Sequence, residues 1–144
     1  ACCWPPAGKR GVGFSRANLF GKHFDEYKKE ALEPLLVAQI EHIKAVNNLE
    51  NILKVEGLDA IMVGPYDLSA SMNITGEFDN RDFISIMGKI LKQCKKYNIP
   101  CGDHIVQPDP KLLEKRIKQG YQFIAYSTDG IFLYSSSVAP KPSI

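Results

Sequence analysis

Two nearly all-apolar runs, separated by a segment of helical periodicity, form the most regular part of the chain. The runs are Leu35–Glu41 and Leu58–Val63. Continuous apolar runs of this length, bounded by polar or turn residues, are typical of strands that are buried on both faces of a parallel sheet. The segment between them, about His42–Glu56, places apolar residues on one helical face and ends at Gly57. The pattern therefore predicts a β-α-β unit whose two strands are parallel.

The same alternation continues toward the C-terminus. We expect a helix over about Asp82–Tyr97, a strand over Ile99–Val106, a helix that starts with Asp109-Pro110 and ends at Gly120, and a strand over Tyr121–Tyr126. Four strands, each followed by a helix, imply an α/β fold with a right-handed parallel sheet. A closed eight-stranded barrel needs about 250 residues. The 144 residues are enough for half of such a barrel or for a small open sheet.

The two ends of the chain are less regular than this repeat. Residues 1–34 are interpreted as a loop followed by a helix over about Phe24–Leu32, and residues 35–137 as the four βα units, with a short last helix over about Ile131–Ser135. Residues 138–144 contain two prolines and are predicted to be a tail. The glycines of the GKRGVG stretch follow no strand, so they are interpreted as turn residues and not as a phosphate-binding loop.

Composition and charge exclude several function classes. The chain is 44% hydrophobic and 24% charged, with a formal net charge of +2, as in ordinary globular proteins. Basic and acidic residues are interspersed, which argues against a nucleic acid or a membrane surface as partner. No apolar stretch approaches the ~20 residues of a membrane span, and no signal peptide is visible. The four cysteines lack metal-type spacing, so we expect reduced thiols in a cytoplasmic protein.

Each of the two apolar runs leads to a carboxylate. Glu41 ends the first run, and Asp67 follows shortly after the second. The carboxyl ends of parallel strands meet at the edge where α/β folds place their chemistry, so these two acids form a candidate site for one divalent metal ion. The residues alone leave a structural interpretation equally open. Asp67 could cap a short helix that starts at Leu68, and Glu41 could pair with a lysine or cap the following helix.

Four stretches, in this order along the chain, resemble one enzyme family: WPPAGKRGVG, VAQIE, VEGLDAIMVGPYDLSASM and GYQFIAYSTD. They are similar to the metal-dependent pyruvate aldolases of the 4-hydroxy-2-oxo-heptanedioate aldolase type, which include macrophomate synthase. The resemblance covers nearly the whole chain. It implies a (β/α)₈ TIM barrel of which this chain supplies the last four βα units, a half-barrel. It also implies a lyase that reversibly cleaves 4-hydroxy-2-oxo acids to pyruvate and an aldehyde through a metal-stabilised enolate.

The resemblance assigns roles to residues around the two acids. Glu41 and Asp67 match the protein ligands of the family's divalent cation, Mg²⁺, Mn²⁺ or Co²⁺, and carboxylate oxygens suit such ions. The backbone N–H groups near Tyr66 and Asp67 are expected to hold the pyruvate carboxylate, and Gln39 to support the site. The expected substrate-binding set is Gln39, Gly64, Pro65, Tyr66 and Asp67.

Two further residues are candidates for catalytic roles. Arg16 aligns loosely with an arginine that meets the distal group of the substrate in the family. His104 lies near the end of the third predicted strand, where it is either a proton donor or a structural histidine. Asp103 and Asp129 are interpreted as helix-entry or loop residues. The family's own catalytic histidine and an arginine that contacts the keto oxygen belong to the first half of the barrel, which this sequence does not contain.

The missing half leaves an alternative function open. The chain could be a catalytically incomplete half-barrel that binds metal or pyruvate, or that only assembles with another chain. The resemblance implies a small 2-oxo acid as substrate and a homo-oligomer, a hexamer in the family. Because a half-barrel exposes two sheet edges, we expect self-association or pairing with a complementary half.

Overall fold

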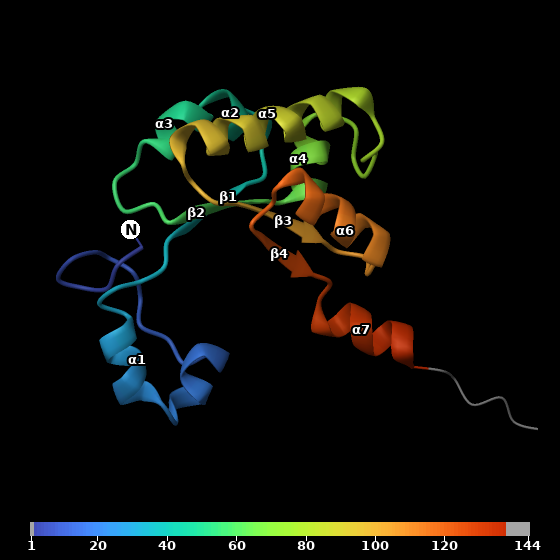
Figure 1. Cartoon of the computed structure of the whole chain (residues 1–144). Coiled ribbons are helices and arrows are strands. Elements are labelled where there is room, and N and C mark those ends of the chain that lie inside the picture. Colours follow the sequence, from blue (N-terminus) through green and yellow to red (C-terminus); the bar gives the residue numbers. More distant parts are fainter. Residues whose placement is uncertain (1, 138–144) are drawn as a thin grey trace, which may run out of the picture. The chain divides into compact units, whose positions relative to one another are not determined.

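The structure is a computed structural model that describes residues 2–137, and these form two compact units divided between Leu36 and Val37. The predicted tail, residues 138–144, lies outside the described residues. The strands are β1 (Val37–Ile40), β2 (Ala60–Val63), β3 (Cys101–Ile105) and β4 (Phe123–Tyr126) (Figure 1). The helices of the second unit are α2 (Ile43–Asn47), α3 (Leu49–Leu53), α4 (Pro65–Ser71), α5 (Arg81–Tyr97), α6 (Pro110–Gln119) and α7 (Asp129–Ser136).

The four strands form one sheet in the order β1-β2-β3-β4, and every neighbouring pair is parallel. The prediction of an α/β fold with four parallel strands is therefore confirmed. Ile40 of β1 lies opposite Val63 of β2, and Val63 lies opposite Asp103 of β3. Each strand starts two residues later than expected, and Pro100 precedes β3 instead of belonging to it.

One face of the sheet is packed against helices, which Figure 1 shows above the strands as α2, α3 and α5. Apolar side chains from β1, β2 and β3 meet apolar side chains from α2 to α5 in a single core. Phe83 and Ile90 of α5 and Leu68 of α4 are at most 1% exposed. Truncating side chains of this kind to alanine typically costs about 2–5 kcal/mol. The core contains Ile40, Val46, Leu49, Leu53, Ile61, Val63, Leu68, Phe83, Met87, Ile90, Cys94, Cys101 and Tyr121.

The expectation that the strands are buried on both faces is wrong for β1. Ile40 is 1% exposed, whereas Val37 is 41% exposed and Gln39 is also exposed. Side chains alternate between the two faces of a strand, and the helices of this unit that contribute to the core cover only the face that holds Ile40. The apolar run correctly predicted a hydrophobic strand, but in this unit helices pack against only one face of β1.

Three helices differ from the predicted ones. The expected helix over 42–56 is divided into α2 and α3 at Asn48, whose backbone (φ −103°, ψ 12°) leaves the helical region. Asparagine competes for backbone hydrogen bonds and is a poor residue inside a helix. The sequence left open a short helix that starts at Leu68, and α4 instead starts at Pro65, which occupies its first turn, where proline is favoured. The expected ends of α6 are confirmed, since the Asp109 side chain caps the first turn and Gly120 (φ 99°) follows the last.

The first unit holds a 3₁₀ helix, η1 (Arg16–Gly21), and α1 (Phe24–Glu30). Helix α1 starts where the sequence predicted and ends two residues early. Aromatic rings hold this unit together, because Trp4 meets Tyr27 edge to face with ring centroids 5.2 Å apart. The Tyr27 hydroxyl accepts a hydrogen bond from Arg10 Nη2 at 3.1 Å. The unit thus has a small packing centre of its own.

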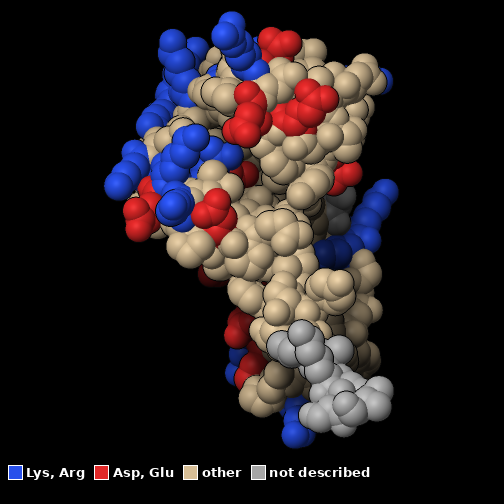
Figure 2. Space-filling view, turned by 90° about the vertical axis from the view of Figure 1, so that its right-hand side faces the viewer, with Lys and Arg blue, Asp and Glu red and all other residues tan. Residues whose placement is uncertain are grey.

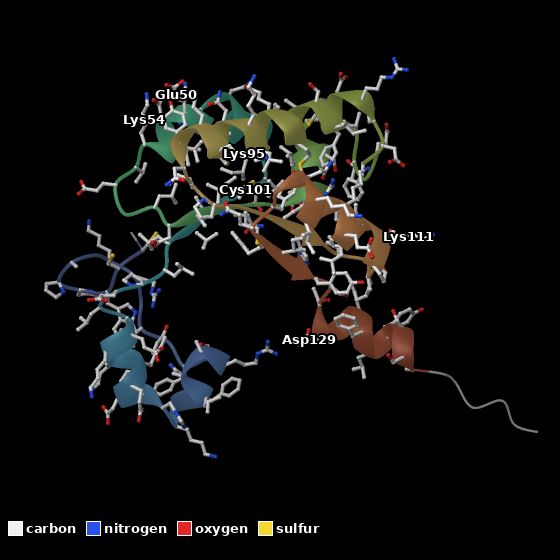
Figure 3. All side chains as sticks on the ribbon, in the orientation of Figure 1. Glu50, Lys54, Lys95, Cys101, Lys111 and Asp129 are labelled. Carbon is white, nitrogen blue, oxygen red and sulfur yellow. The ribbon has the colours of Figure 1, made fainter. Side chains whose placement is uncertain are left out.

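The outer surface of the helix layer carries local charge pairs. Figure 3 shows Glu50 and Lys54 on the side of α3 that points away from the sheet. Glu50 Oε1 accepts hydrogen bonds from Lys54 Nζ at 2.8 Å and from the Tyr97 hydroxyl at 2.6 Å, and these two donors lower the pKa of Glu50 to about 2. On the face shown in Figure 2, Lys and Arg side chains likewise lie among Asp and Glu side chains. In the described part of the chain, no helix has the length and apolar character to cross a membrane.

A close approach between β3 and β4 gives a test of this packing. Gly102 lies opposite Phe123 in the sheet, and a Cβ atom at Gly102 would overlap the Phe123 ring. We expect Gly102→Ala to lower the free energy of unfolding by about 1–3 kcal/mol, as overpacking does. Gly88→Ala is the control, because no atom lies within 4 Å of the added methyl in α5, and alanine is favoured over glycine in a helix by about 1 kcal/mol. Urea unfolding followed by circular dichroism measures both, and a Gly102→Ala protein as stable as the wild type would contradict the packing.

Candidate active site

Glu41 and Asp67 lie at the same edge of the sheet, as the sequence predicted. Glu41 directly follows Ile40, the last residue of β1, and Asp67 lies in the first turn of α4, which follows β2. The β1–β2 pairing extends one step beyond the strands, because the Gly64 N–H donates to the Ile40 carbonyl at 3.1 Å. This bond holds the backbone just before Glu41 against the backbone just before α4, the helix that carries Asp67.

Gly64 has no side chain at the point where Gln39 and Glu41 approach it. A Cβ atom at Gly64 would lie 3.0 Å from Gln39 Nε2, 3.1 Å from Glu41 Cβ and 3.4 Å from Glu41 Oε2. Such distances are shorter than comfortable van der Waals contacts. Glycine at this position therefore lets the side chains of Gln39 and Glu41 lie against the backbone of the β2–α4 junction. The structure thus brings together three of the predicted site residues, Gln39, Glu41 and Gly64.

Neither acid of the pair has a hydrogen-bonding or ion-pairing partner among residues 2–137. Glu41 and Asp67 are both exposed. Two carboxylates without partners at one edge supply oxygen ligands of the kind that Mg²⁺ and Mn²⁺ prefer. No group of three or more His, Cys, Asp or Glu residues suited to a metal occurs in the described chain. A cation held by this pair would thus keep several coordination positions for water or substrate.

The structural alternatives for the two acids are not realised among the described residues. Helix α4 starts at Pro65 after Gly64, so Asp67 lies inside its first turn and is not its cap. The cap of α2 is His42, whose Nδ1 accepts from the Lys44 N–H at 3.1 Å, and Glu41 has no part in it. No lysine of the described chain pairs with Glu41.

Gln39, Gly64 and His104 share the face of the sheet that is opposite to the core. Gln39 lies opposite Met62 and Met62 lies opposite Gly102, so the next positions along this face are Glu41, Gly64 and His104. His104 is half-buried, and its Nε2 lies 3.4 Å from the Ser127 carbonyl. The contact with Ser127 gives the ring a structural role at this edge, and a proton-transfer role stays a prediction.

Asp103 was interpreted as a helix-entry or loop residue, and this is wrong. It lies in the middle of β3, is 2% exposed, and its Oδ2 accepts from Arg116 Nε of α6 at 2.6 Å. Arg116 also lies over the ring of Tyr121, 5.6 Å from its centroid, and burial together with the Asp103 charge raises the pKa of Tyr121. Asp129 is different, because it is the first residue of α7, as the helix-entry interpretation expected.

A cavity of about 700 Å³ lies between α5, α6 and β3, on the side of the sheet that carries the buried ion pair. Its lining includes Asp103, Arg116 and Tyr121. Of the predicted site residues, only Pro65, Tyr66 and His104 line it. Glu41, Gly64 and Asp67 do not line this cavity.

Arg16 is the first residue of η1 and belongs to the first unit. The other predicted site residues belong to the second unit. Arg16 as a contact for the distal group of the substrate stays a prediction.

A sequence profile of the HpcH/HpaI aldolase/citrate lyase family matches residues 3–136. The chain is 33% identical over 146 aligned residues to a hydroxypyruvate/pyruvate aldolase of Roseobacter denitrificans, covering 98% of this chain and 56% of that protein. It is 35% identical over 127 residues to a 4-hydroxy-2-oxovalerate aldolase of Novosphingobium aromaticivorans, covering 88% of this chain and 47% of that protein. The chain therefore spans about half the length of the curated relatives it matches.

The structure of the chain is also similar to solved structures of this family. The crystal structure of an HpcH/HpaI aldolase/citrate lyase family protein from Burkholderia cenocepacia superimposes with a TM-score of 0.72 at 28% identity. The match covers 94% of this chain and 54% of that one. The fold and the sequence thus point to the same group of proteins.

The buried pair of Asp103 and Arg116 gives a prediction on stability. We expect Arg116→Met to lower the free energy of unfolding by about 3–5 kcal/mol, because Asp103 keeps a buried charge without its partner. In Asp103→Asn/Arg116→Met the loss is expected to be smaller than the sum of the two single losses. Lys118→Met is the control, since Lys118 and Glu114 form an exposed pair at 3.8 Å of a kind that contributes at most about 1 kcal/mol. Urea unfolding of the wild type and of the four variants, including Asp103→Asn alone, measures these losses, and strictly additive losses would contradict the coupling.

Proposed function

The chain belongs to the HpcH/HpaI aldolase/citrate lyase family, and from this membership we propose that it carries the metal- and pyruvate-binding edge of a divalent-metal-dependent aldolase. The reaction is the reversible cleavage of a 4-hydroxy-2-oxo acid to pyruvate and an aldehyde. The observation that supports this assignment most directly is that Glu41, after β1, and Asp67, in the first turn of α4, lie at the same edge of the sheet and have no partners in the described chain.

The proposed metal ligands are the carboxylates of Glu41 and Asp67, and the proposed ion is Mg²⁺, Mn²⁺ or Co²⁺. When bound there, such a cation supplies Lewis-acid stabilisation of the negative charge that develops on the keto oxygen of the substrate. The two carboxylates contribute the charge that binds the cation, and the exposed edge leaves room for a bidentate 2-oxo acid. Gln39 lies beside Glu41 near Gly64 and supports its position.

The backbone at the start of α4 fits a substrate carboxylate. Pro65 has no N–H group, and the Leu68 N–H donates to the Gly64 carbonyl at 2.9 Å. Between them, the N–H groups of Tyr66 and Asp67 have no acceptor among the described residues. Free N–H groups in the first turn of a helix attract anions. We assign these two groups to the carboxylate of pyruvate.

The face of the sheet that is opposite to the core suits the interior of a closed barrel. Gln39, Met62 and Phe123 lie on this face, and Val37 beside them is 41% exposed. Strands β1 and β4 are the edges of the four-stranded sheet. We propose that four further βα units, outside this chain, pair with both edges and close an eight-stranded barrel. The family's acid–base histidine would belong to those units, and His104 and Arg16 are the catalytic candidates in this chain.

The alternative of a fragment that only binds metal or pyruvate is not favoured. Curated relatives of the chain are named as aldolases of hydroxypyruvate and pyruvate, of 4-hydroxy-2-oxovalerate and of 5-keto-4-deoxy-D-glucarate. The chain matches them over nearly its whole length. We therefore propose an enzyme whose complete activity needs both halves of the barrel, and the cytoplasmic location stays a prediction.

The metal assignment is tested with Glu41→Gln and Asp67→Asn, which remove one charge each and keep the side-chain shape. We expect each variant to weaken Mn²⁺ binding by at least about 10-fold. The loss of an outer-shell partner already has an effect of this size, and Glu41 and Asp67 are proposed as direct ligands. Electron paramagnetic resonance of free Mn²⁺ during a titration measures the affinity. In the assembled enzyme, each of the two variants should also lose metal-dependent pyruvate release. Glu56→Gln, an exposed acid in the turn before β2, is the control. Wild-type affinity in both site variants would contradict the assignment.

The half-barrel proposal predicts association of the isolated chain. Helix α7 presents Phe132, Leu133 and Tyr134, which are 45%, 75% and 83% exposed, in addition to the two open sheet edges. Exposed apolar surface and open edges favour pairing with another chain. Sedimentation velocity over a concentration series should show species heavier than the monomer, and Leu133→Ser should reduce them. Val55→Ser, at an exposed apolar residue outside α7, serves as the control, and a monomer at every concentration would refute the expectation.

A further inference from the structure

The two proposed metal ligands lie on short segments that are tied together at both ends. Glu41 belongs to the segment from Ile40 to Ile43, and Asp67 belongs to the segment from Gly64 to Ser71. The first tie is the hydrogen bond from the Gly64 N–H to the Ile40 carbonyl at 3.1 Å. The second tie is made by a side chain, the hydroxyl of Ser71. Both acids lie between the two ties.

The Ser71 hydroxyl makes two hydrogen bonds at the same time. It donates to the Leu68 carbonyl in the last turn of α4 at 2.7 Å. It accepts from the Ile43 N–H, the first residue of α2, at 2.9 Å. The second bond joins residues 28 positions apart in the sequence. One oxygen atom thus connects the end of α4 to the start of α2.

Both partners of Ser71 are groups that helices leave unsatisfied. The first N–H groups of a helix and its last carbonyls have no partner within the helix. In α2, the Lys44 N–H is bound by the His42 side chain and the Ile43 N–H by Ser71. Without the Ser71 hydroxyl, nothing else in the described chain accepts from the Ile43 N–H. The start of α2, two residues after Glu41, would then lose its direct link to α4.

We propose that Ser71 is a positioning residue for the metal site, which sets the Glu41 carboxylate at a fixed distance from the Asp67 carboxylate by tying α2 to α4. This inference rests on the proposed function, since it assigns Ser71 to the assembly of the same site. Ser71 itself binds neither metal nor substrate in this assignment. Outer-shell residues that orient metal ligands commonly change metal affinity by about 10–100-fold when they are lost.

Ser69 offers a closely matched control in the same helix. Its hydroxyl also donates to a carbonyl three residues earlier, that of Tyr66, at 2.8 Å, and also accepts a backbone N–H, that of Gly76, at 3.0 Å. The two serines therefore make the same kinds of bond. Ser69, however, ties α4 to the loop that follows it, and not to the segment that carries Glu41. A general loss of α4 stability should appear in both variants, and a loss of the metal site only in Ser71→Ala.

The experiment compares wild type, Ser71→Ala, Ser71→Thr and Ser69→Ala in the full chain, with Mn²⁺ alone as the probe. The Mn²⁺ dissociation constant is measured by electron paramagnetic resonance at a temperature well below thermal unfolding of each protein. Amide hydrogen exchange, followed by nuclear magnetic resonance, reports the protection of the Ile43 N–H. We expect Ser71→Ala to raise the dissociation constant about 10-fold and to expose the Ile43 amide. Ser69→Ala should stay within about 2-fold of wild type, and Ser71→Thr, which keeps the hydroxyl, should restore most of the affinity.

The possible results separate this inference from the function it rests on. Equal Mn²⁺ affinities of wild type, Ser71→Ala and Ser69→Ala would overturn the positioning role and leave the metal site intact. Equal losses of Mn²⁺ affinity in both alanine variants would mean that Ser71 only stabilises α4, and this result would also overturn the positioning role. Absence of Mn²⁺ binding in the wild type would remove the proposed site itself, and the inference with it. Loss in Ser71→Ala alone, with rescue by Ser71→Thr, supports it.

Discussion

The alternation of side chains along parallel strands is the constraint on which the rest of the structure depends. Strand β1 buries Ile40 against the helices, so its neighbours Gln39 and Glu41 must lie on the opposite face. The parallel register carries this choice across the sheet and places Gly64 and His104 on the same face as Glu41. A slip of one residue would turn the Glu41 carboxylate into the apolar core, where an unpaired charge is strongly unfavourable. The position of the candidate site is therefore a consequence of how the core is filled.

Much of the helix layer could be predicted from local pattern, because the physics that forms it is local. The spacing of Phe83, Met87 and Ile90 placed α5 on the core, and all three are buried. The expected cap of α6 at Asp109 needs only its own neighbours, since its side chain accepts from the N–H groups two and three residues later. The burial of β1 could not be predicted in this way. An apolar run shows that Val37 is hydrophobic, but it does not show whether the partner for that residue belongs to the same chain.

The candidate site, too, could be predicted from the sequence only in part. Strand order and the carboxyl-end rule were sufficient to bring Glu41 and Asp67 to one edge. They were not sufficient to place the start of α4 at Pro65, because Gly64 and Pro65 are both turn-forming residues and suggest a loop after the strand. Nor could they show that Asp103, which lies within the predicted strand over Ile99–Val106, is buried in an ion pair. Its partner Arg116 lies on the next helix, and only the folded chain brings the two charges within 2.6 Å.

Asp103, a structural carboxylate, differs from Glu41 and Asp67, the proposed metal ligands, in its burial and in its partners. Asp103 is 2% exposed and is neutralised by an arginine that is itself held by Gln119 and stacked on Tyr121. Glu41 and Asp67 lie at an open edge, and the ties that hold their segments use only neutral groups, a backbone carbonyl and the hydroxyl of Ser71. Solvent screening makes two such unpaired charges tolerable in the absence of a cation. A basic residue in place of the neutral ties would stabilise the edge more strongly, but it would compete directly with a divalent ion. Neutral ties leave the full charge of both carboxylates available for a cation, and this arrangement is what a reversible metal-binding edge requires.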